Sequence, residues 1–148
     1  MGRRSRTPRR GGSRVHAAAL FRSVILDAGL LVAFDRGERR ARSFLAASVR
    51  ADEALHTTAP VLAQVWRDGA QQARLAHIAK SITVHPFAAD DYTTVGQLLA
   101  RSGSADVVDA HLVVLAVRTG HSIITSDADD FIALAGHLGT AAPKIHRW

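Results

Sequence analysis

The stretch SADVVDAHLVVLAVRTGHSIITSDADDF, residues 104–131, places five aspartates beside two of the most apolar runs in the chain. Residues 105–120 have the composition of a long, mostly buried helix that ends at Gly120. The run SIIT, residues 122–125, predicts a buried strand, and residues 127–135 predict a helix that opens with acids. The stretch therefore predicts buried elements whose ends carry like charges.

Outward from this stretch, short β-branched runs alternate with helical patterns. Strands are expected at residues 24–26, 55–58 and 81–86, with a weak edge strand at 144–148, and helices at 28–34, 38–50, 60–80 (in two pieces divided near Asp68 and Gly69) and 88–101. Such alternation predicts an α/β fold of three layers, α/β/α, around a mostly parallel sheet of four to five strands.

The overall composition limits the protein class. A chain of 148 residues with 47% hydrophobic content is long enough for one globular domain with a sizeable core. It has no cysteine, which excludes disulfides, thiolate metal sites and a cysteine nucleophile, and which fits a cytoplasmic location. No run reaches the roughly 18 uncharged apolar residues that cross a bilayer, so we expect no membrane association.

The net charge of +6 belongs to the amino-terminal tail. Residues 1–22 contain seven arginines and no acid; subtracting these seven from the 19 basic residues leaves 12 against 13 acidic ones. We expect a disordered basic tail over 1–22, followed by a single domain over 23–148. The tail either attracts nucleic acid nonspecifically or is a solvated extension without a role.

The aspartates occupy positions from which they can meet. Asp27 follows the first predicted strand and Asp127 follows the fourth, and functional crevices of parallel sheets lie beyond the carboxyl ends of the strands. If those two strands are neighbours, the two carboxylates converge. Asp106 and Asp109 share one face of the long helix, although Asp106 can equally act as its amino-terminal cap. Asp130 is expected in the first turn of the next helix.

Several carboxylates in one crevice repel one another and are partly desolvated. Either some of them stay protonated, or a divalent cation lies among them. An all-oxygen set without cysteine suits Mg²⁺ or Mn²⁺, and such an ion favours hydrolysis of a phosphodiester. It would also reverse the negative potential that otherwise repels RNA. Asp129, by contrast, is expected to face solvent.

Three motifs in this order resemble the PIN-domain ribonucleases, in particular the VapC toxins of toxin–antitoxin pairs: VILDAGLLVAF (24–34), VVDAHLVVLA (107–116) and IITSDADDF (123–131). The resemblance extends from Val24 to the end of the chain. It implies a Mg²⁺-dependent endoribonuclease with a PIN-like α/β/α fold, which forms a homodimer and is neutralised by a cognate antitoxin protein.

The resemblance also implies the roles of individual acids. Asp27, Asp109 and Asp127 match the first, third and fourth acids of the family, which hold the metal and carry catalysis. Asp106, Asp130 and Gln64 are possible auxiliaries to the metal site. The family's remaining acid is a glutamate on the helix after the second strand, and Gln64 stands in its place. An amide oxygen can accept from a bound water but adds no negative charge.

Two alternatives to an active nuclease remain open. A PIN-like protein without the glutamate can be a degenerate scaffold that binds a partner. A phosphatase or receiver domain is disfavoured, because residue 29 is glycine where a phosphatase needs aspartate, and Lys80 and Lys144 are the only lysines.

The remaining polar and aromatic residues have simple interpretations. The histidines, including His111, are taken as incidental, and Trp66 is taken as a core or interface residue rather than a base-stacking one. The arginines at 39, 40, 42, 67 and 74 either line an RNA path or solvate helix surfaces.

Overall fold

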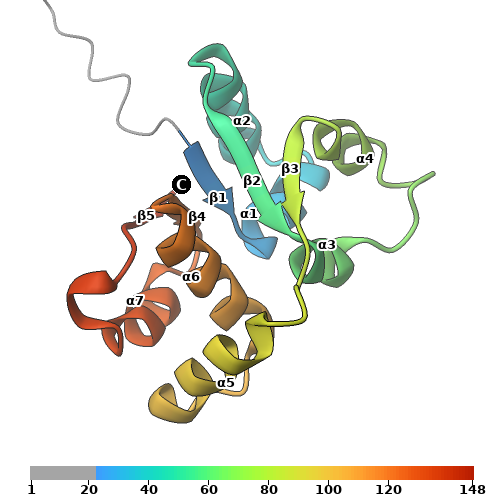
Figure 1. The fold of residues 1–148 in the computed structure, drawn as a ribbon. Coiled ribbons are helices and arrows are strands. Elements are labelled where there is room, and N and C mark those ends of the chain that lie inside the picture. Colours follow the sequence, from blue (N-terminus) through green and yellow to red (C-terminus); the bar gives the residue numbers. More distant parts are fainter. Residues whose placement is uncertain (1–22) are drawn as a thin grey trace, which may run out of the picture.

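Five short strands form a parallel sheet in the order β3-β2-β1-β4-β5 (Figure 1). The computed structural model describes residues 23–148, so the expectations for the basic tail fall outside the described residues. The strands are β1 (Ser23–Leu26), β2 (Ala54–Thr58), β3 (Ile82–His85), β4 (Ser122–Thr125) and β5 (Ile145–Arg147). The weak strand expected near the carboxyl terminus is present, and it lies at the edge of the sheet as predicted.

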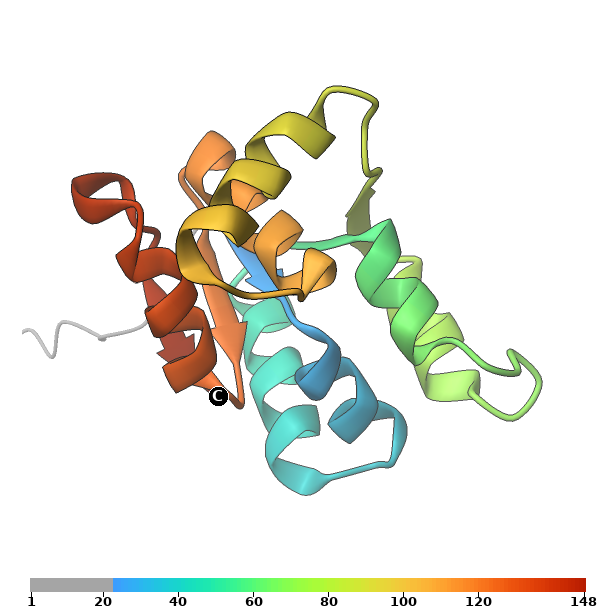
Figure 2. The ribbon, with the colours of Figure 1, turned by 90° about the horizontal axis from the view of Figure 1, so that it is seen from below.

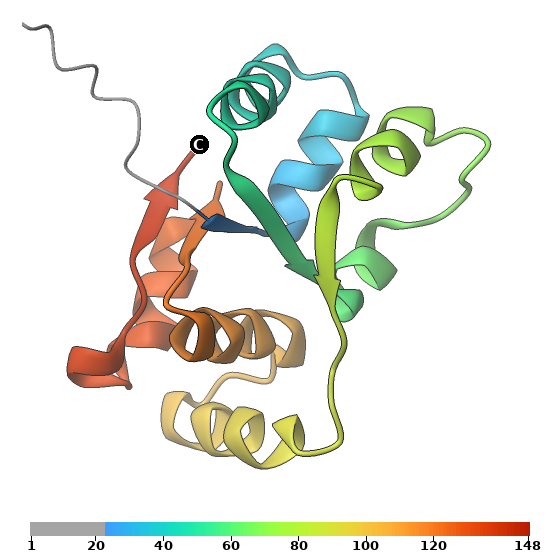
Figure 3. The same ribbon diagram turned by 45° about the horizontal axis from the view of Figure 1, so that its top comes forward.

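Helices cover both faces of the sheet, which confirms the three-layer prediction (Figures 2 and 3). One face carries α1 (Ala28–Asp35), α2 (Arg39–Arg50), α3 (Ala59–Val65) and α4 (Ala73–Ala79), and the other carries α5 (Asp91–Ser102), α6 (Val107–Thr119) and α7 (Ala128–Gly136). A short 3₁₀ turn, Gly139–Ala141, precedes β5. This distribution follows from right-handed crossovers, because the chain moves from β1 outward to β3 and then returns to the other side of β1.

Side-chain caps and glycines set where several helices begin and end. Thr58 accepts a hydrogen bond from the backbone N–H of Val61 at the start of α3, whose first turn contains proline. Gly120 ends α6 with a left-handed φ of 71°. The helix expected from residue 88 begins only at Asp91, because the Asp91 carboxylate accepts the N–H of Ala88 in a preceding turn, at 2.8 Å.

The core lies around β1, β4 and α6. The apolar side chains of both strands and every residue of α6 from Ala110 to Ala116 are buried. Strands covered on both faces are expected to be continuously apolar, as these are. Because β1 and β4 pair directly, with Leu26 opposite Ile124, the strand ends that precede Asp27 and Asp127 are held side by side.

Among residues 23–148, no helix combines the length and apolar character needed to cross a membrane.

Candidate acidic active site

Asp27 is held at the junction of the two central strands. It is only 5% exposed, directly after β1. Its Oδ1 accepts the backbone N–H of Leu30 at 2.9 Å, so Asp27 caps α1, and its Oδ2 accepts the Thr125 hydroxyl at 2.5 Å. Burial raises the pKa of Asp27 above its ordinary value, and these hydrogen bonds only partly offset that effect. The carboxylate is fixed in orientation but costly to ionise.

Thr125 links the first and fourth acidic positions. Its buried hydroxyl donates to Asp27 and also accepts the backbone N–H of Asp127 at 2.9 Å. The next residue, Ser126, lies against Gly29, where a Cβ would come 2.6 Å from the serine Oγ. The motif TSD therefore contributes through all three of its residues, and a side chain at position 29 would displace the Ser126 hydroxyl. The sequence did not identify Thr125, Ser126 or Gly29 as part of the site.

Asp109 lies in the first turn of α6 and lines a hollow of about 350 Å³. Asp106 and Asp130 line the same hollow, with Ser102, Ser104 and His137. The pKa of Asp109 is raised to about 7, first by burial and then by the negative charges of four neighbouring aspartates: Asp106, Asp27, Asp130 and Asp127. The structure therefore gathers the predicted acids closely enough for each of them to act on Asp109.

Asp106 serves as the cap of α6. Its Oδ1 accepts the backbone N–H groups of Val108 at 3.0 Å and of Asp109 at 2.9 Å. Of the two roles open to it from the sequence, the capping role is present. Because the second carboxylate oxygen makes no contact with the helix end, capping leaves it available to the neighbouring hollow.

The acids around α7 differ in environment. Asp127 is exposed at the amino-terminal end of α7 and makes no side-chain capping bond. Asp130 is also exposed and lines the hollow with Asp109. Asp129 is 83% exposed, as predicted, and forms an ion pair with Arg147 at 2.9 Å. The side chain of Asp127 is therefore free of helix-end contacts at the rim of the crevice.

The donor chemistry of this crevice fits a hard divalent cation. Asp109 resists ionisation first because it is partly buried and then because its neighbours are also acids, and a cation would offset both effects. In residues 23–148, however, no three carboxylate or imidazole side chains are close enough to ligate one ion directly. Mg²⁺ usually keeps several water ligands in proteins, so a hydrated ion fits the set of oxygens.

The chain has counterparts among known proteins in sequence family and in fold. The family model of the PIN domain matches residues 24–137, most of the chain. The chain belongs to the PIN domain family. Its fold is also similar to that of VapBC2 from Rickettsia felis, solved bound to a DNA fragment from its promoter. The TM-score is 0.62 at 13% identity, over 85% of this chain and 98% of that one. No curated protein sequence matches the chain.

Gln64 lies apart from the hollow of Asp109 in this PIN domain. It is exposed on α3 and lines a different hollow, of about 250 Å³, with Asp35 and Gln72. Asp35 accepts hydrogen bonds from the Gln72 amide at 3.1 Å and from the Leu75 N–H at 3.2 Å. This second hollow is therefore braced by contacts between α1 and the start of α4, rather than by repelling acids.

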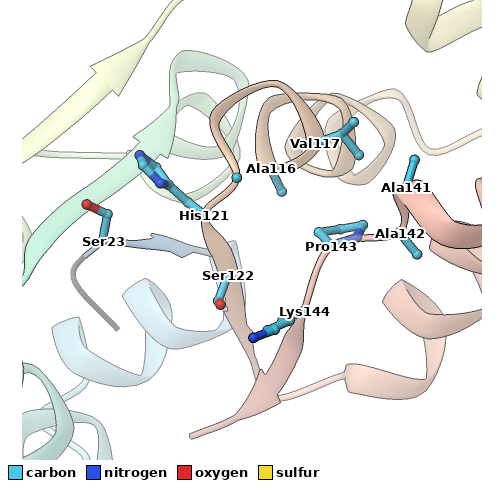
Figure 4. Close-up of a pocket in the computed structure, with 10 residues that line it drawn as sticks. Ser23, Ala116, Val117, His121, Ser122, Ala141, Ala142, Pro143 and Lys144 are labelled. Atoms are coloured by element: carbon cyan, nitrogen blue, oxygen red, sulfur yellow. The ribbon is translucent and has the colours of Figure 1, made fainter. Parts of the chain in front are cut away.

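A larger hollow lies at the opposite end of the sheet (Figure 4). It has a volume of about 460 Å³ and is lined by residues before and at the start of β1, β4 and β5, among them Ser23, His121, Ser122 and Lys144. None of its lining residues is a carboxylate. The size of a hollow is therefore no guide to the site here, because the acids gather at the carboxyl ends of the strands.

The interpretation of His111 as incidental is wrong. His111 is fully buried in α6, and its Nε2 lies 3.2 Å from a carboxylate oxygen of Asp91 in α5. The other oxygen of Asp91 accepts from Arg118 at 2.7 Å. Burial alone would raise the pKa of Asp91, but the hydrogen bond from Ala88 and the Arg118 guanidinium bring it below its ordinary value. This buried pair braces α5 against the helix that carries Asp109.

Three further histidines meet on the sheet, although the sequence shows no paired spacing among them. His56 Nδ1 lies 3.0 Å from His85 Nε2, and the His56 and His121 rings are 4.6 Å apart. Burial lowers the pKa of His56 and of His85, and neighbouring basic groups lower each further. The rings of His56 and His85 are therefore neutral at neutral pH and pack as aromatic groups.

Proposed function

We propose that this PIN domain is a metal-dependent endoribonuclease that hydrolyses RNA phosphodiesters as the toxin of a toxin–antitoxin pair. The observation that carries the proposal is the state of Asp109, whose pKa of about 7 reflects burial among Asp27, Asp127 and the auxiliary acids. When the neighbouring aspartates are ionised, their negative charges attract a cation to the Asp109 carboxylate. A divalent cation can then take the place of the Asp109 proton. The position of the acids beyond β1 and β4 supports the same reaction.

The chain's own residues have distinct roles in this reaction. Asp27, Asp109 and Asp127 would hold Mg²⁺, or Mn²⁺, which supplies Lewis acidity and offsets the phosphate charge. Asp27 is oriented by Thr125 and Leu30, so its unused lone pairs have a fixed direction. Asp109, whose pKa is raised to about 7, would be ionised while such an ion is held. Together the acids orient a water for in-line attack on phosphorus, leaving a 5′-phosphate and a 3′-hydroxyl.

A protein partner and a second copy of the chain complete the proposal. The early helices carry a groove of about 780 Å³, whose lining combines the apolar Phe34, Leu45, Val49 and Ile78 with the arginines at 39, 42 and 50. Val49 is exposed in it, so a partner that covers the groove would bury apolar surface there. The groove is the candidate surface for homodimerisation. The acidic crevice, in turn, suits an arginine inserted by the antitoxin.

The proposal is tested by cleavage of a panel of structured RNAs with Mg²⁺ or Mn²⁺ present. Asp27→Asn and Asp109→Asn are each expected to abolish cleavage and growth inhibition, while circular dichroism shows both variants folded. Asp90→Asn is the matched control, because Asp90 is an exposed aspartate at another helix start with no capping bond. Full cleavage by both site variants would overturn the assignment.

A degenerate, partner-binding PIN domain is the second candidate, and Gln64 is the observation that favours it. The family's glutamate is replaced by an exposed amide, and one negative charge is lost. Under this alternative the wild-type protein neither cleaves RNA nor binds Mn²⁺ in calorimetry. Cleavage by Gln64→Glu together with an inactive wild type would establish that the substitution disabled the site.

A further inference from the structure

A further hollow, distinct from the one that Gln64 lines, adjoins the acidic crevice at the carboxyl end of β5. Its volume is about 250 Å³, and it is lined by Glu38, Arg40, Ser126, Arg147 and Trp148. Ser126 separates the two: it precedes Asp127 and lies against Gly29 beside the Asp27 carboxylate. A polymer whose reacting group sits among the acids therefore has this hollow as its immediate neighbour.

The guanidinium of Arg147 makes two contacts, which leave some of its N–H donors unused. One of its terminal nitrogens donates to the backbone carbonyl of Ser126 at 3.2 Å, and the other pairs with Asp129 at 2.9 Å. Both side chains of that ion pair are largely exposed, Arg147 to 53%. Exposed pairs contribute little to stability, and a guanidinium has five N–H donors. Arg147 can therefore exchange Asp129 for a phosphate at little cost.

Trp148 follows this cation in the chain, and its half-buried indole packs against the hydrophobic core on one part of its surface. Its backbone N–H donates to the carbonyl of Thr125 at 3.3 Å, so the residue is fixed next to the strand end that positions Asp27. The guanidinium of Arg40, from the start of α2, lies 5.9 Å from the centre of the indole ring. The indole Nε1 has no hydrogen-bond partner within the described part of the chain.

The lining of the hollow favours an anion once Arg147 leaves Asp129. Arg40 and Arg147 contribute two positive charges, against the carboxylate of Glu38 in the lining and that of Asp129, which pairs with Arg147 from outside it. Arginines with an adjoining aromatic face are a common way to bind single-stranded nucleic acid, since the guanidinium binds phosphate and the ring stacks on a base. The acidic crevice next to it is negatively charged. The crevice is therefore suited to a cation, and the hollow with the two arginines is suited to a phosphate chain.

We propose that this hollow, the Arg40–Arg147–Trp148 pocket, binds the nucleotide adjacent to the scissile phosphodiester of the RNA. Its phosphate lies between the two guanidinium groups, and its base stacks on the indole. The proposal rests on the proposed function for the identity of the polymer. It adds three substrate-binding residues, none of which touches the acids directly.

Binding is measured separately from cleavage. The chain has two tryptophans, so Trp66→Phe leaves Trp148 as the only fluorophore of its kind. In that background, with Asp109→Asn to prevent turnover, the protein is titrated with a pool of short randomised single-stranded RNA in Mg²⁺. We expect a change in Trp148 emission on binding. Arg40→Ala and Arg147→Ala should each weaken binding severalfold and reduce the slope of log affinity against log salt by about 0.7.

Lys144→Ala is the matched control, because Lys144 is an exposed cation that immediately precedes β5, at the end of that strand opposite Arg147 (Figure 4). All variants retain the basic tail, so its nonspecific contribution cancels. Trp148→Phe keeps a ring and should retain most of the affinity, measured with labelled RNA, whereas Trp148→Ala should lose it.

The two proposals fail in different ways. Unchanged affinity in both arginine variants, with no response from Trp148, overturns the pocket even if the wild type cleaves RNA. A specific loss of binding in those variants without metal-dependent cleavage by the wild type overturns the nuclease and leaves a pocket for single-stranded RNA.

Discussion

The pKa of Asp109 predicts that removing its charge stabilises the protein while removing its activity. In the folded state this pKa is about 7, against 3.8 for an unperturbed aspartate. The folded protein therefore keeps a proton that the unfolded chain has already released, and the free energy of unfolding falls as the pH rises through this window. Asp109→Asn cannot ionise, so it should escape that loss.

The size of the effect follows from the shift. One pKa unit corresponds to about 1.4 kcal/mol, so the shift sets an upper limit of about 4 kcal/mol. Asp109 is only partly buried, and water and salt screen its interactions with the exposed Asp127 and Asp130. We therefore expect Asp109→Asn to raise the free energy of unfolding by about 1–2 kcal/mol at about pH 8.

The assay is urea unfolding at constant ionic strength, without divalent ions, at about pH 8 and about pH 5. The stability gap between variant and wild type should narrow by about half or more at the lower pH, because wild-type Asp109 is then protonated in the folded state. Adding Mg²⁺ should reduce or reverse the gap, since a ligand that binds the folded wild type adds to its stability. Asp90→Asn should show no such dependence on pH or Mg²⁺.

Two results would refute this reasoning. An Asp109→Asn variant that is less stable than the wild type at the higher pH would show that the carboxylate is not repelled in the folded state. A gap of equal size at both pH values would show that some interaction other than ionisation causes it.

Three further predictions concern the groups around the acids. Thr125→Val should lower the free energy of unfolding by about 1.5–3 kcal/mol in a urea titration, because the buried Asp27 carboxylate loses its hydroxyl donor and keeps only the backbone donor on its other oxygen. Thr57→Val, at an equally buried threonine that donates to a neutral carbonyl, should cost about 1 kcal/mol in the same titration. Asp106→Ala should cost about 1 kcal/mol through loss of the α6 cap, and equal stability in thermal unfolding would rule that cap out as a stabilising contact. Gly29→Ala should impair metal-dependent cleavage at least tenfold (about 1.4 kcal/mol) by displacing the adjacent serine, and unimpaired kcat/KM would contradict the close approach.

The fold was predictable because its central strands are buried and because a glycine marks the end of its long helix. The runs at residues 24–26 and 122–125 are short and continuously apolar, which is typical of strands covered on both faces. Gly120 marks the end of the long helix. The meeting of Asp27 and Asp127 then depended on a single condition, that these strands are neighbours, and the sheet order meets it.

The missing parts of the site depend on contacts across the sequence. Nothing in the motif TSD distinguishes Thr125, since its hydroxyl acts on a carboxylate 98 residues away. His111 was missed for a similar reason, because its partner, Asp91, lies 20 residues earlier in another helix. One signal was present: a histidine in the centre of an apolar helix needs a buried polar partner, and an aspartate at a neighbouring helix start is a candidate.

The contact between Asp27 and Thr125 also has a consequence for synthesis of the chain. The two residues come from opposite ends of the domain, and only the docking of β4 beside β1 brings them together. Contacts between residues so distant in sequence form late, because the chain must close a long loop before it gains them. While a ribosome is still translating the intervening segment, Asp27 has neither its hydroxyl donor nor the other acids beside it. A growing chain therefore has no assembled acidic centre until nearly the whole domain has emerged, so under the proposed function RNA near the ribosome would not be cleaved by a partly synthesised chain.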